Sequence, residues 1–450
     1  MPFPKKVFKA YDIRGLLEEI TPELAEAVAA ALIRLTGSKK VVVGRDMRET
    51  SPALADATIQ ALTERGVNVV DIGLCSTPLF YYACTFLEGV KGGLMITASH
   101  NPAEYNGIKL MNAEGMPMSG EEIYEEIHQP PSPPIAGGNR SVGSVEKREV
   151  LEAYLDKVVA SIDLPDVSGV KLAIDYGNGM GALTVQPLLK RLGVTPTELY
   201  PEFDARFPNH QADPVQPKNL VDLQQLMKTE QFDLGVATDG DADRIGFLDA
   251  DGNYVRGDLV TALFAREVLK KHPGSAIAVA PNQSWAVFDT IEQAGGKAIS
   301  TRIGHTNVSL GMKASGAKLG GEISSHFFFE EFGYLESPDL ALITLLKMLT
   351  ESEASFADLM EEFRAYQNSG EVNLEIEDKA AALAALEEKY TPVATKVDKL
   401  DGIRCEFEKD WWFIVRPSNT EPLLRVTVEA KTKELMDEKV DELVSFIHSL

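Results

Sequence analysis

The segment 39–71 reads KKVVVGRDMRETSPALADATIQALTERGVNVVD and contains a complete strand–helix–strand pattern. The apolar run at its start predicts a buried strand. Ser51 and Pro52 then provide an N-cap and a first helical position, and Gly66 provides the left-handed residue that ends a helix. A second apolar run, 67–71, follows at once. Two strands joined by one helix through short links predict a βαβ unit of a mainly parallel sheet.

The same pattern occurs twice more in the chain. It is found at 170–200, where Gly193 ends the helix, and at 276–301, where Gly295 and Gly296 end it. Because each copy is one strand–helix–strand unit, three spaced copies predict three similar mixed α/β domains.

The C-terminal part follows a different pattern. Residues 372–376 alternate polar and apolar side chains as a half-exposed strand does, and strand patterns follow at 402–408, 412–416 and 424–430. An amphipathic helix is predicted at 434–448. This order predicts an α+β domain built on an antiparallel sheet.

Domain boundaries are predicted at segments rich in turn residues. A Pro- and Gly-rich loop at 129–138 lies near the end of the first domain. The predicted domains are 1–146, 147–250, 251–368 and 369–450, and a helix predicted at 340–350 falls in the third of them.

Composition and charge exclude several partners. The 450 residues include 44 Lys and Arg against 68 Asp and Glu, so the formal net charge is −24. Such a surface repels nucleic acid and anionic membranes, which favours small-molecule ligands. Three scattered cysteines without a C-x-x-C pair predict reduced thiols and a cytoplasmic location. No apolar run approaches the roughly 18 residues of a membrane span.

A short polar segment, 97–102 (TASHNP), follows the apolar run 92–96. A strand that ends in small polar residues delivers them to a loop at its tip, so we predict that Ser99 is exposed there beside His100. A polar turn closed by Asn-Pro is the alternative interpretation. Taken with the next two segments, the pattern indicates a serine that carries phosphate.

The segment 239–244 (DGDADR) places three carboxylates within five residues, after the apolar run 232–237. Such carboxylates repel one another unless a cation lies among them, and their oxygens are ligands suited to Mg²⁺. An EF-hand is excluded, because its sixth position is Arg244 and its twelfth is Ala250. A solvated acidic turn is the alternative. Arg244 is itself suited to holding a substrate phosphate.

The segment 416–422 (RPSNTEP) offers a guanidinium group, hydroxyls, an amide and loop N–H groups. Together these groups can bind an anion, and Arg425 adds a further positive charge. A locally positive loop also explains how so acidic a chain can bind a sugar phosphate. A polar hairpin with a solvated Arg425 is the alternative.

In the segment 321–326 (GEISSH), Glu322, Ser324 and His326 are two residues apart. An extended chain would therefore direct all three side chains to one side. Glu and Ser can accept hydrogen bonds from sugar hydroxyls, and His can transfer a proton. A strand whose polar groups are satisfied within the protein is the alternative.

Two further features are weaker. A turn at 11–15 (YDIRG) contains Tyr11 and Arg14, and Lys109 lies ten residues after Ser99. We predict that Lys109 folds back toward Ser99 and acts as a general acid or base if neighbouring cations depress its pKa. A surface lysine is the alternative.

One motif indicates another function. Residues 177–182 (GNGMGA) follow a predicted strand, open a helix and match the dinucleotide fingerprint, and Glu198 ends the next strand. An NAD-binding oxidoreductase would explain this motif. We favour a tight strand-to-helix turn without a ligand, because the other polar segments would otherwise have no role.

Taken together, these motifs resemble the α-D-phosphohexomutases. The segments 97–102, 239–244, 321–326 and 416–422 occur in that family's order and span the chain, and 11–15 is similar to its opening motif. The resemblance implies four domains around a central cleft. It implies an isomerase that moves phosphate between C6 and C1 of a hexose through a phosphoserine and a hexose 1,6-bisphosphate.

The resemblance also implies roles for individual residues. Ser99 corresponds to the phosphoserine, and together with Asp239, Asp241 and Asp243 to the Mg²⁺ ligands. The implied catalytic residues are Ser99, His100, Lys109, Arg14, Arg244 and His326. The implied substrate-binding residues are Tyr11, His305, Glu322, Ser324, His326, Arg416, Ser418, Asn419, Thr420 and Arg425. Glucose or mannose 1,6-bisphosphate would serve as activator.

The sugar loop bears on the choice of substrate. GEISSH is similar to the loop of phosphomannomutase/phosphoglucomutases and differs from the glutamine-containing loop of phosphoglucosamine mutases. Residues 281–284 (PNQS) lack the phosphate-contacting lysine of some bispecific members. This departure leaves the preference between the sugars open. Mannose and/or glucose phosphates are the expected substrates, with a phosphoglucosamine mutase or a non-catalytic sugar-phosphate sensor as alternatives. A monomer or weak homo-oligomer is expected.

Overall fold

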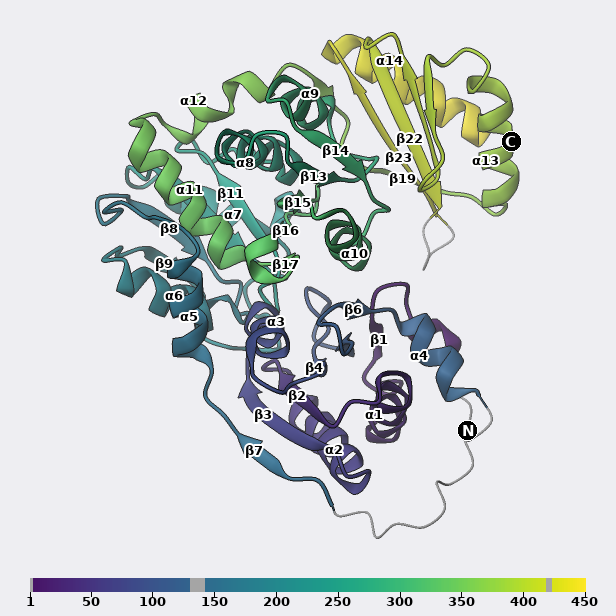
Figure 1. Cartoon of the computed structure of the whole chain (residues 1–450). Helices are drawn as coiled ribbons and strands as arrows, with labels where there is room; N and C mark the ends of the chain where they lie inside the picture. The colour runs from purple at the N-terminus through teal and green to yellow at the C-terminus, as the bar shows by residue number, and fades with distance from the viewer. Residues whose placement is uncertain (1–2, 130–141, 418–422) are drawn as a thin grey trace. The chain divides into compact units, whose positions relative to one another are not determined.

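The computed structural model describes residues 3–129, 142–417 and 423–450. By its internal contacts the chain divides into two compact units. The first unit comprises residues 1–256 and 324–357, and the second comprises 257–323 and 358–450. Figure 1 shows the elements of both.

The first sheet of the first unit has seven strands in the order β1-β5-β4-β2-β3-β7, with β6 paired to β5. The pairs β2–β3, β2–β4 and β3–β7 are parallel, and those made by β5 are antiparallel. The strands are β1 (Ile13–Leu16), β2 (Lys40–Arg45), β3 (Asn68–Leu74), β4 (Gly93–Ile96), β5 (Tyr105–Met111), β6 (Pro117–Met118) and β7 (Val145–Lys147). The helices are α1 (Pro22–Thr36), α2 (Ser51–Glu64), α3 (Thr77–Phe86) and α4 (Gly120–Ile127).

The predicted βαβ unit at 39–71 is confirmed as β2, α2 and β3. Gly66 has a positive φ of 76°, as expected for a residue that ends a helix. The predicted N-cap is wrong by one residue, because Thr50 holds that position and Ser51 begins the helix. The Ser51 hydroxyl donates instead to Asp46 Oδ1 at 2.6 Å, since that buried carboxylate needs donors.

The second sheet of the first unit has the order β12-β11-β10-β8-β9. Its strands are β8 (Leu172–Asp175), β9 (Thr197–Leu199), β10 (Leu234–Thr238), β11 (Ile245–Leu248) and β12 (Tyr254–Val255). The helices near it are α5 (Leu151–Ala160), α6 (Gly181–Arg191), α7 (Val221–Met227) and α11 (Pro338–Ser352). Strands β16 (Phe327–Phe329) and β17 (Leu335–Glu336) form an antiparallel pair that is not part of this sheet. The helix predicted at 340–350 is therefore present as α11, and it packs against α5, α6 and β11.

In the second unit, β13 (Ala276–Val279) pairs in parallel with both β14 (Lys297–Ser300) and β15 (Leu319–Gly321). Its helices are α8 (Gly257–Lys271), α9 (Trp285–Gln293) and α10 (His305–Ser315). The third predicted strand–helix–strand copy is thus confirmed as β13, α9 and β14. In helix α12 (Phe356–Met360), residues 356–357 belong to the first unit and residues 358–360 to the second.

The C-terminal part of the second unit is the predicted α+β domain. Its antiparallel sheet has the order β18-β23-β22-β21-β20, with β19 paired to β23. The elements are β18 (Gln367–Asn368), β19 (Val372–Glu375), α13 (Lys379–Tyr390), β20 (Lys396–Asp398), β21 (Ile403–Phe407), β22 (Trp411–Pro417), β23 (Leu423–Ala430) and α14 (Lys433–His448). Helix α14 packs on β23 (Figure 1). Leu443 of this helix belongs to the same hydrophobic core as Phe413 and Val428.

None of the helices in the described part of the chain has both the length and the apolar composition of a membrane span. Short 3₁₀ turns complete the structure at Lys5–Val7, Pro217–Asn219, Glu330–Phe332 and Glu361–Phe363.

A buried carboxylate on α11 generates a prediction about stability. Asp339 is 1% exposed and accepts a hydrogen bond from the Tyr154 hydroxyl of α5. Burial raises the pKa of Asp339 from 3.8 to about 6. The charged form is disfavoured in the folded chain, so stability falls as the pH rises from about 4 through about 6.

We therefore expect Asp339→Asn to gain stability relative to the wild type as the pH rises from 4 to 7. The difference in unfolding free energy should change by about 2–3 kcal/mol over that range. Urea titrations at several pH values measure it, and Asp56→Asn, at an exposed position on α2, is the control. A difference that does not vary with pH would contradict the assignment.

Candidate active site

The loop after β4 holds Ser99 in an unusual conformation. Its φ is 50°, in the left-handed region that L-residues other than Gly, Asn and Asp rarely adopt. The Ser99 N–H donates to Thr97 Oγ1 at 3.0 Å, which helps to fix the turn. The prediction of an exposed Ser99 is wrong, because the residue is only 3% exposed. The reason is that the loop after β10 packs directly against it.

That second loop carries the three aspartates. Strand β10 leads into it, and Ala242 adopts a φ of 60° between two of the acids. The backbone N–H groups of Asp243 and Arg244 donate to Asp239 Oδ1 at 3.0 and 3.1 Å. Asp239, Asp241 and Asp243 are at most 2% exposed, and one oxygen from each lies within 4.8 Å of the others. The loop therefore gathers three carboxylates at a buried point.

The two loops meet at Ser99. The Ser99 hydroxyl donates to Asp239 Oδ2 at 2.9 Å and lies 3.1 Å from His100 Nδ1. Gly240 allows this approach, because a Cβ there would overlap the Ser99 carbonyl oxygen. Thr77, the first residue of α3, donates its hydroxyl to Asp241 Oδ2 at 2.7 Å. A hydroxyl able to carry a phosphoryl group thus lies beside the acidic cluster.

Lys109 enters the same acidic cluster from β5, where it contacts Asp241 and Asp243. Its ammonium group is 2.8 Å from Asp241 Oδ2 and also pairs with Asp243. Burial alone would lower its pKa, but the Asp241 and Asp243 carboxylates outweigh burial and raise the pKa well above the ordinary value. The expectation of a depressed pKa is therefore wrong, and the two carboxylates keep the Lys109 side chain protonated.

The cluster has the properties of a divalent cation site. Burial, together with the charges of Asp243 and Asp241, raises the pKa of Asp239 well above its ordinary value. Asp241 Oδ1 is buried and accepts no hydrogen bond. Lys109 and Arg244 bring two positive charges against the three aspartates and Asp213, so negative charge remains. Carboxylate oxygens at this spacing are the hard ligands that Mg²⁺ and similar ions take. The aspartates can therefore hold a metal ion.

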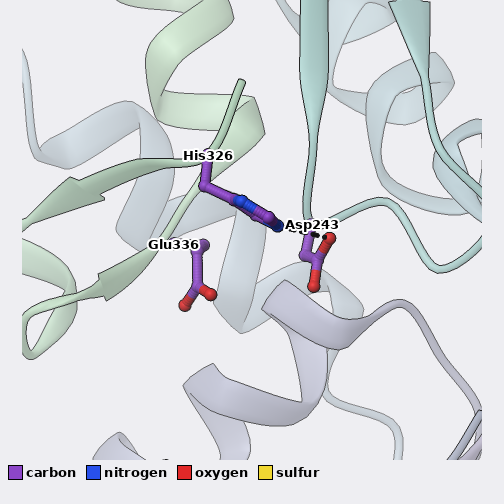
Figure 2. Close-up of side chains that lie close together, drawn as sticks. All are labelled: Asp243, His326 and Glu336. Carbon is purple, nitrogen blue, oxygen red and sulfur yellow. Dashed lines mark ion pairs between the residues drawn. The ribbon is translucent and has the colours of Figure 1, made fainter. Parts of the chain in front are cut away.

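Arg244 and His326 border the cluster on one side. Arg244 Nη1 lies 3.2 Å from Asp213 Oδ1, and its Nε donates to His326 Nε2 at 3.3 Å. His326 Nε2 also lies 3.3 Å from Asp243 Oδ1, while its Nδ1 contacts Ser324 Oγ at 2.8 Å. Figure 2 shows the imidazole directed at Asp243, with Glu336 nearby. Both ring nitrogens of His326 thus have a polar neighbour.

His100 is held neutral. Burial, with the positive charges of Arg244 and Arg14 nearby, lowers its pKa well below the ordinary value. A neutral imidazole can donate to or accept from the Ser99 hydroxyl according to its tautomer. Arg14, on β1, donates to Asn101 Oδ1 at 2.7 Å and pairs with Asp12, so it also lies against the Ser99 loop. Tyr11 belongs to the same unit, just before β1.

The segment 321–326 departs from the prediction of an extended chain. Strand β15 ends at Gly321, and a turn follows in which Ser325 adopts a φ of 65°. The expected regular alternation of side chains is therefore wrong, because a left-handed residue interrupts it. Glu322, in the second unit, accepts the Gly304 N–H at 2.7 Å, and His305 begins α10 there. Both are buried.

The predicted anion site also lies in the second unit. Arg416 on β22 is the direct cross-strand partner of Arg425 on β23. Like charges placed opposite each other are unfavourable unless an anion joins them, which suits a phosphate. Asp401 is 3.9 Å from Arg416, and Glu371 is 3.3 Å from Arg425. The predicted residues Ser418, Asn419 and Thr420 lie outside the described residues.

The glycines of the dinucleotide-like motif have a structural role. A Cβ at Gly179 would approach the Asp239 carbonyl oxygen to 2.9 Å, and one at Gly181 would overlap Thr238. The Met180 N–H donates to the Gly240 carbonyl oxygen at 2.9 Å. The motif therefore lets the start of α6 pack against the aspartate loop, which accounts for the glycines without a nucleotide.

Four residues that contact the site had no recognisable sequence signal. Thr77 donates a hydrogen bond to Asp241, and Asp213 pairs with Arg244, as described above. Gln211 Nε2 donates to the His100 carbonyl oxygen at 2.5 Å. Arg48 binds the Ser99 loop and is analysed below. Each acts through contacts between segments far apart in the chain, which local spacing does not reveal.

Comparison with known proteins identifies the family. Four models of phosphoglucomutase/phosphomannomutase match the chain in order. The alpha/beta/alpha domains I, II and III match residues 5–132, 152–252 and 256–366, and the C-terminal domain matches 371–445.

Individual proteins are similar over nearly their whole length. A phosphomannomutase of Methanocaldococcus jannaschii is 35% identical, covering 99% of this chain and 98% of that protein. A phosphomannomutase/phosphoglucomutase of Pseudomonas aeruginosa is 34% identical, with coverage of 96% and 94%. A crystal structure of a phosphoglucomutase/phosphomannomutase family protein from Burkholderia thailandensis superposes with a TM-score of 0.89 at 30% identity, covering 99% and 98%.

The fold and the site thus define an isomerase of the phosphohexomutase class. The chain belongs to the phosphoglucomutase/phosphomannomutase family, and the resemblance found in the sequence is confirmed. Sugar phosphates are the substrates that this class implies. The phosphoglucosamine mutase alternative is less supported: an N-acetylphosphoglucosamine mutase structure from Aspergillus fumigatus is 13% identical, a likeness of fold alone.

The acidic cluster generates a prediction about metal binding. We expect Asp241→Asn to weaken Mn²⁺ or Mg²⁺ binding at least tenfold, because it removes one charged oxygen ligand from a buried site. Calorimetric titration of the whole protein measures it. Asp251→Asn, at an exposed position beyond β11, should leave the titration unchanged. Equal affinities in both variants would refute the assignment of the metal to these aspartates.

Proposed function

We propose that the chain interconverts the 6- and 1-phosphates of mannose and glucose, with Ser99 carrying the phosphoryl group. The observation that carries this proposal is the 2.9 Å hydrogen bond from the Ser99 hydroxyl to Asp239, at the edge of the buried aspartate cluster. A serine in this position can present a phosphate to a cation held by Asp239, Asp241 and Asp243. Mg²⁺ is the proposed ion, because all the available ligands are oxygens.

The phosphoryl transfer then depends on positioning and charge. When bound, Mg²⁺ would neutralise charge on the transferred group. A sugar hydroxyl attacks the phosphorus of phosphoserine 99, so that the P–O bond to the sugar forms as the bond to Ser99 breaks. His326 accepts the hydroxyl proton. The protonated ammonium group of Lys109 is the proposed source of the proton that the departing Ser99 oxygen takes up. Arg244 and Arg14 hold phosphate oxygens, and neutral His100 orients the Ser99 oxygen.

The product of this step is a hexose 1,6-bisphosphate, which must present its other phosphate to Ser99 before release. The residues proposed to bind the sugar are Tyr11, His305, Glu322 and Ser324. The cross-strand pair Arg416 and Arg425 binds the phosphate that is not transferred, with Ser418, Asn419 and Thr420. Glucose or mannose 1,6-bisphosphate would prime the enzyme by phosphorylating Ser99.

Two observations support mannose and glucose as the sugars. The relatives named above include a phosphomannomutase and a phosphomannomutase/phosphoglucomutase. The GEISSH loop also lacks the glutamine expected of a phosphoglucosamine mutase.

The buried free thiols of Cys75, Cys84 and Cys405 suit the reducing cytoplasm that we propose as the location of the protein.

Mass spectrometry tests the phosphoserine directly. Incubation of the wild-type chain with glucose 1,6-bisphosphate and Mg²⁺ should add one phosphoryl group, mapped to the peptide that contains Ser99. Ser99→Ala should remain unmodified and lose at least a thousandfold in turnover, because the transfer has no acceptor; its melting temperature should change little. Turnover of the alanine variant near the wild-type rate would exclude the proposal.

The sugar preference has its own test. Mannose 1-phosphate and glucose 1-phosphate should each be converted with kcat/KM at least a hundred times that of glucosamine 1-phosphate. A matched Glu322→Gln variant should lose activity with both preferred sugars together, since the carboxylate is proposed to bind hydroxyls common to them. Faster turnover of glucosamine 1-phosphate would favour the rival assignment, and ligand binding without turnover would indicate a sugar-phosphate sensor.

A further inference from the structure

The conformation of the Ser99 loop depends on one buried arginine. Arg48 lies in the turn between β2 and α2, far from the loop in sequence, and is only 2% exposed. Its Nη2 donates to the carbonyl oxygens of Ser99 at 2.9 Å and Asn101 at 2.5 Å. Its Nη1 donates to those of Pro102 at 2.7 Å and Tyr105 at 3.0 Å. One guanidinium group thus binds four carbonyl oxygens of the segment 99–105.

The arginine is itself held from two sides. Its Nε lies 3.2 Å from Asp46 Oδ2, and its own backbone N–H donates to Asp46 Oδ1 at 3.0 Å. The backbone N–H of Asp46 in turn donates to the Ile96 carbonyl oxygen at 2.9 Å, at the end of β4. The ring of Phe207 packs 5.4 Å from the guanidinium carbon. The side chain therefore has little freedom to move away from the loop.

The loop needs such a partner. The segment is irregular up to the start of β5 at Tyr105, with Ser99 buried and residues 100–103 half-buried. The Pro102 carbonyl oxygen accepts the Tyr105 N–H at 3.1 Å, but no regular strand or helix precedes β5 to bind the remaining carbonyl oxygens, and an unmet buried carbonyl is costly. The loop also holds Ser99 at a positive φ. Only a planar fork with several donors can serve four oxygens at once; an ammonium group is a single point with three donors.

We propose that Arg48 is a positioning residue that holds the Ser99 loop in the conformation required for phosphoryl transfer. The proposal rests on the proposed function for its catalytic consequence, but the structural role of Arg48 is independent of it. The bond from Ser99 to Asp239 and the close approach of Gly240 both require the loop in this position. Because transfer requires in-line geometry, a displacement of about 1 Å is expected to cost about a hundredfold in rate.

The test compares Arg48→Lys with Arg65→Lys in the whole protein. Arg65 is a suitable control, because it is exposed near the end of α2 and binds a single carbonyl oxygen, that of Ala61. Two quantities are measured. The first is hydrogen–deuterium exchange of the backbone amides in peptides covering 97–106. The second is the single-turnover rate at which glucose 1,6-bisphosphate phosphorylates Ser99.

In Arg48→Lys we expect exchange at 97–106 to rise at least tenfold while exchange in β8 and β10 stays at the wild-type rate. Phosphorylation of Ser99 should slow about a hundredfold. The KM for substrate and the midpoint of a Mg²⁺ titration of the unphosphorylated protein should change less than threefold, because Asp239, Asp241 and Asp243 lie outside the loop. Arg65→Lys should match the wild type in every measurement.

The outcomes separate the two proposals. Unchanged exchange in the loop, or exchange raised equally throughout the first unit, would overturn the positioning role. Faster loop exchange with a normal phosphorylation rate would overturn it as well. If the wild type itself gains no phosphate, the proposed function fails, and the exchange measurement still decides whether Arg48 holds the loop.

A milder variant serves if Arg48→Lys does not fold. Phe207→Leu removes the ring that packs on the guanidinium but leaves its hydrogen bonds in place. It should raise exchange in the same peptides and slow phosphorylation by a smaller factor, about three- to tenfold. Wild-type behaviour in both measurements would overturn the proposal.

Discussion

The structure of the first unit depends on how three buried carboxylates are kept together. Asp239, Asp241 and Asp243 lie out of contact with water, where like charges repel strongly and carboxylates lose their hydration. Lys109 offsets part of this charge, and backbone N–H groups and the Thr77 hydroxyl bind some of the oxygens. The negative charge that these partners do not offset disfavours folding and favours the binding of a cation. The buried aspartates thus lower the stability of the fold at the site where the proposed phosphoryl transfer requires them.

The backbone around the site allows the Ser99 loop after β4 and the aspartate loop after β10 to pack closely against each other. Ser99 and Ala242 both adopt the left-handed conformation, and Gly240 admits the Ser99 carbonyl oxygen where any side chain would collide with it. Gly179 lets the start of α6 approach the aspartate loop from the other side. The resulting contacts join segments from two predicted domains within one compact unit. A phosphoryl group on Ser99 would therefore have a defined position relative to the acids.

The elements with strong local patterns could be predicted from the sequence. The three strand–helix–strand copies and the antiparallel C-terminal sheet follow from apolar periodicity and from glycines at helix ends. The association of Ser99 with the aspartates followed from chemistry, since a phosphate acceptor and a cation site belong together. The resemblance to a known family supplied the roles of residues such as Glu322 and Arg416, which spacing alone left open.

The remaining features depend on tertiary contacts that local sequence does not encode. Ser99 was expected at an exposed loop tip, but the aspartate loop covers it. Residues 321–326 were expected to be extended, but Ser325 turns the chain. The pKa of Lys109 was expected to fall near cations, yet its neighbours are carboxylates that raise it. Arg48 is invisible to pattern analysis, because all four carbonyl oxygens that it binds come from a segment about fifty residues away.

The central claim is that the buried aspartate cluster binds a divalent cation beside Ser99. The most direct test is anomalous diffraction from crystals of the phosphorylated protein grown with Mn²⁺. The account predicts one strong anomalous peak within about 2.0–2.4 Å of an oxygen from each of Asp239, Asp241 and Asp243 and of an oxygen of the Ser99 phosphate. A well-ordered cluster without a peak, or a peak bound to none of these aspartates, would contradict it.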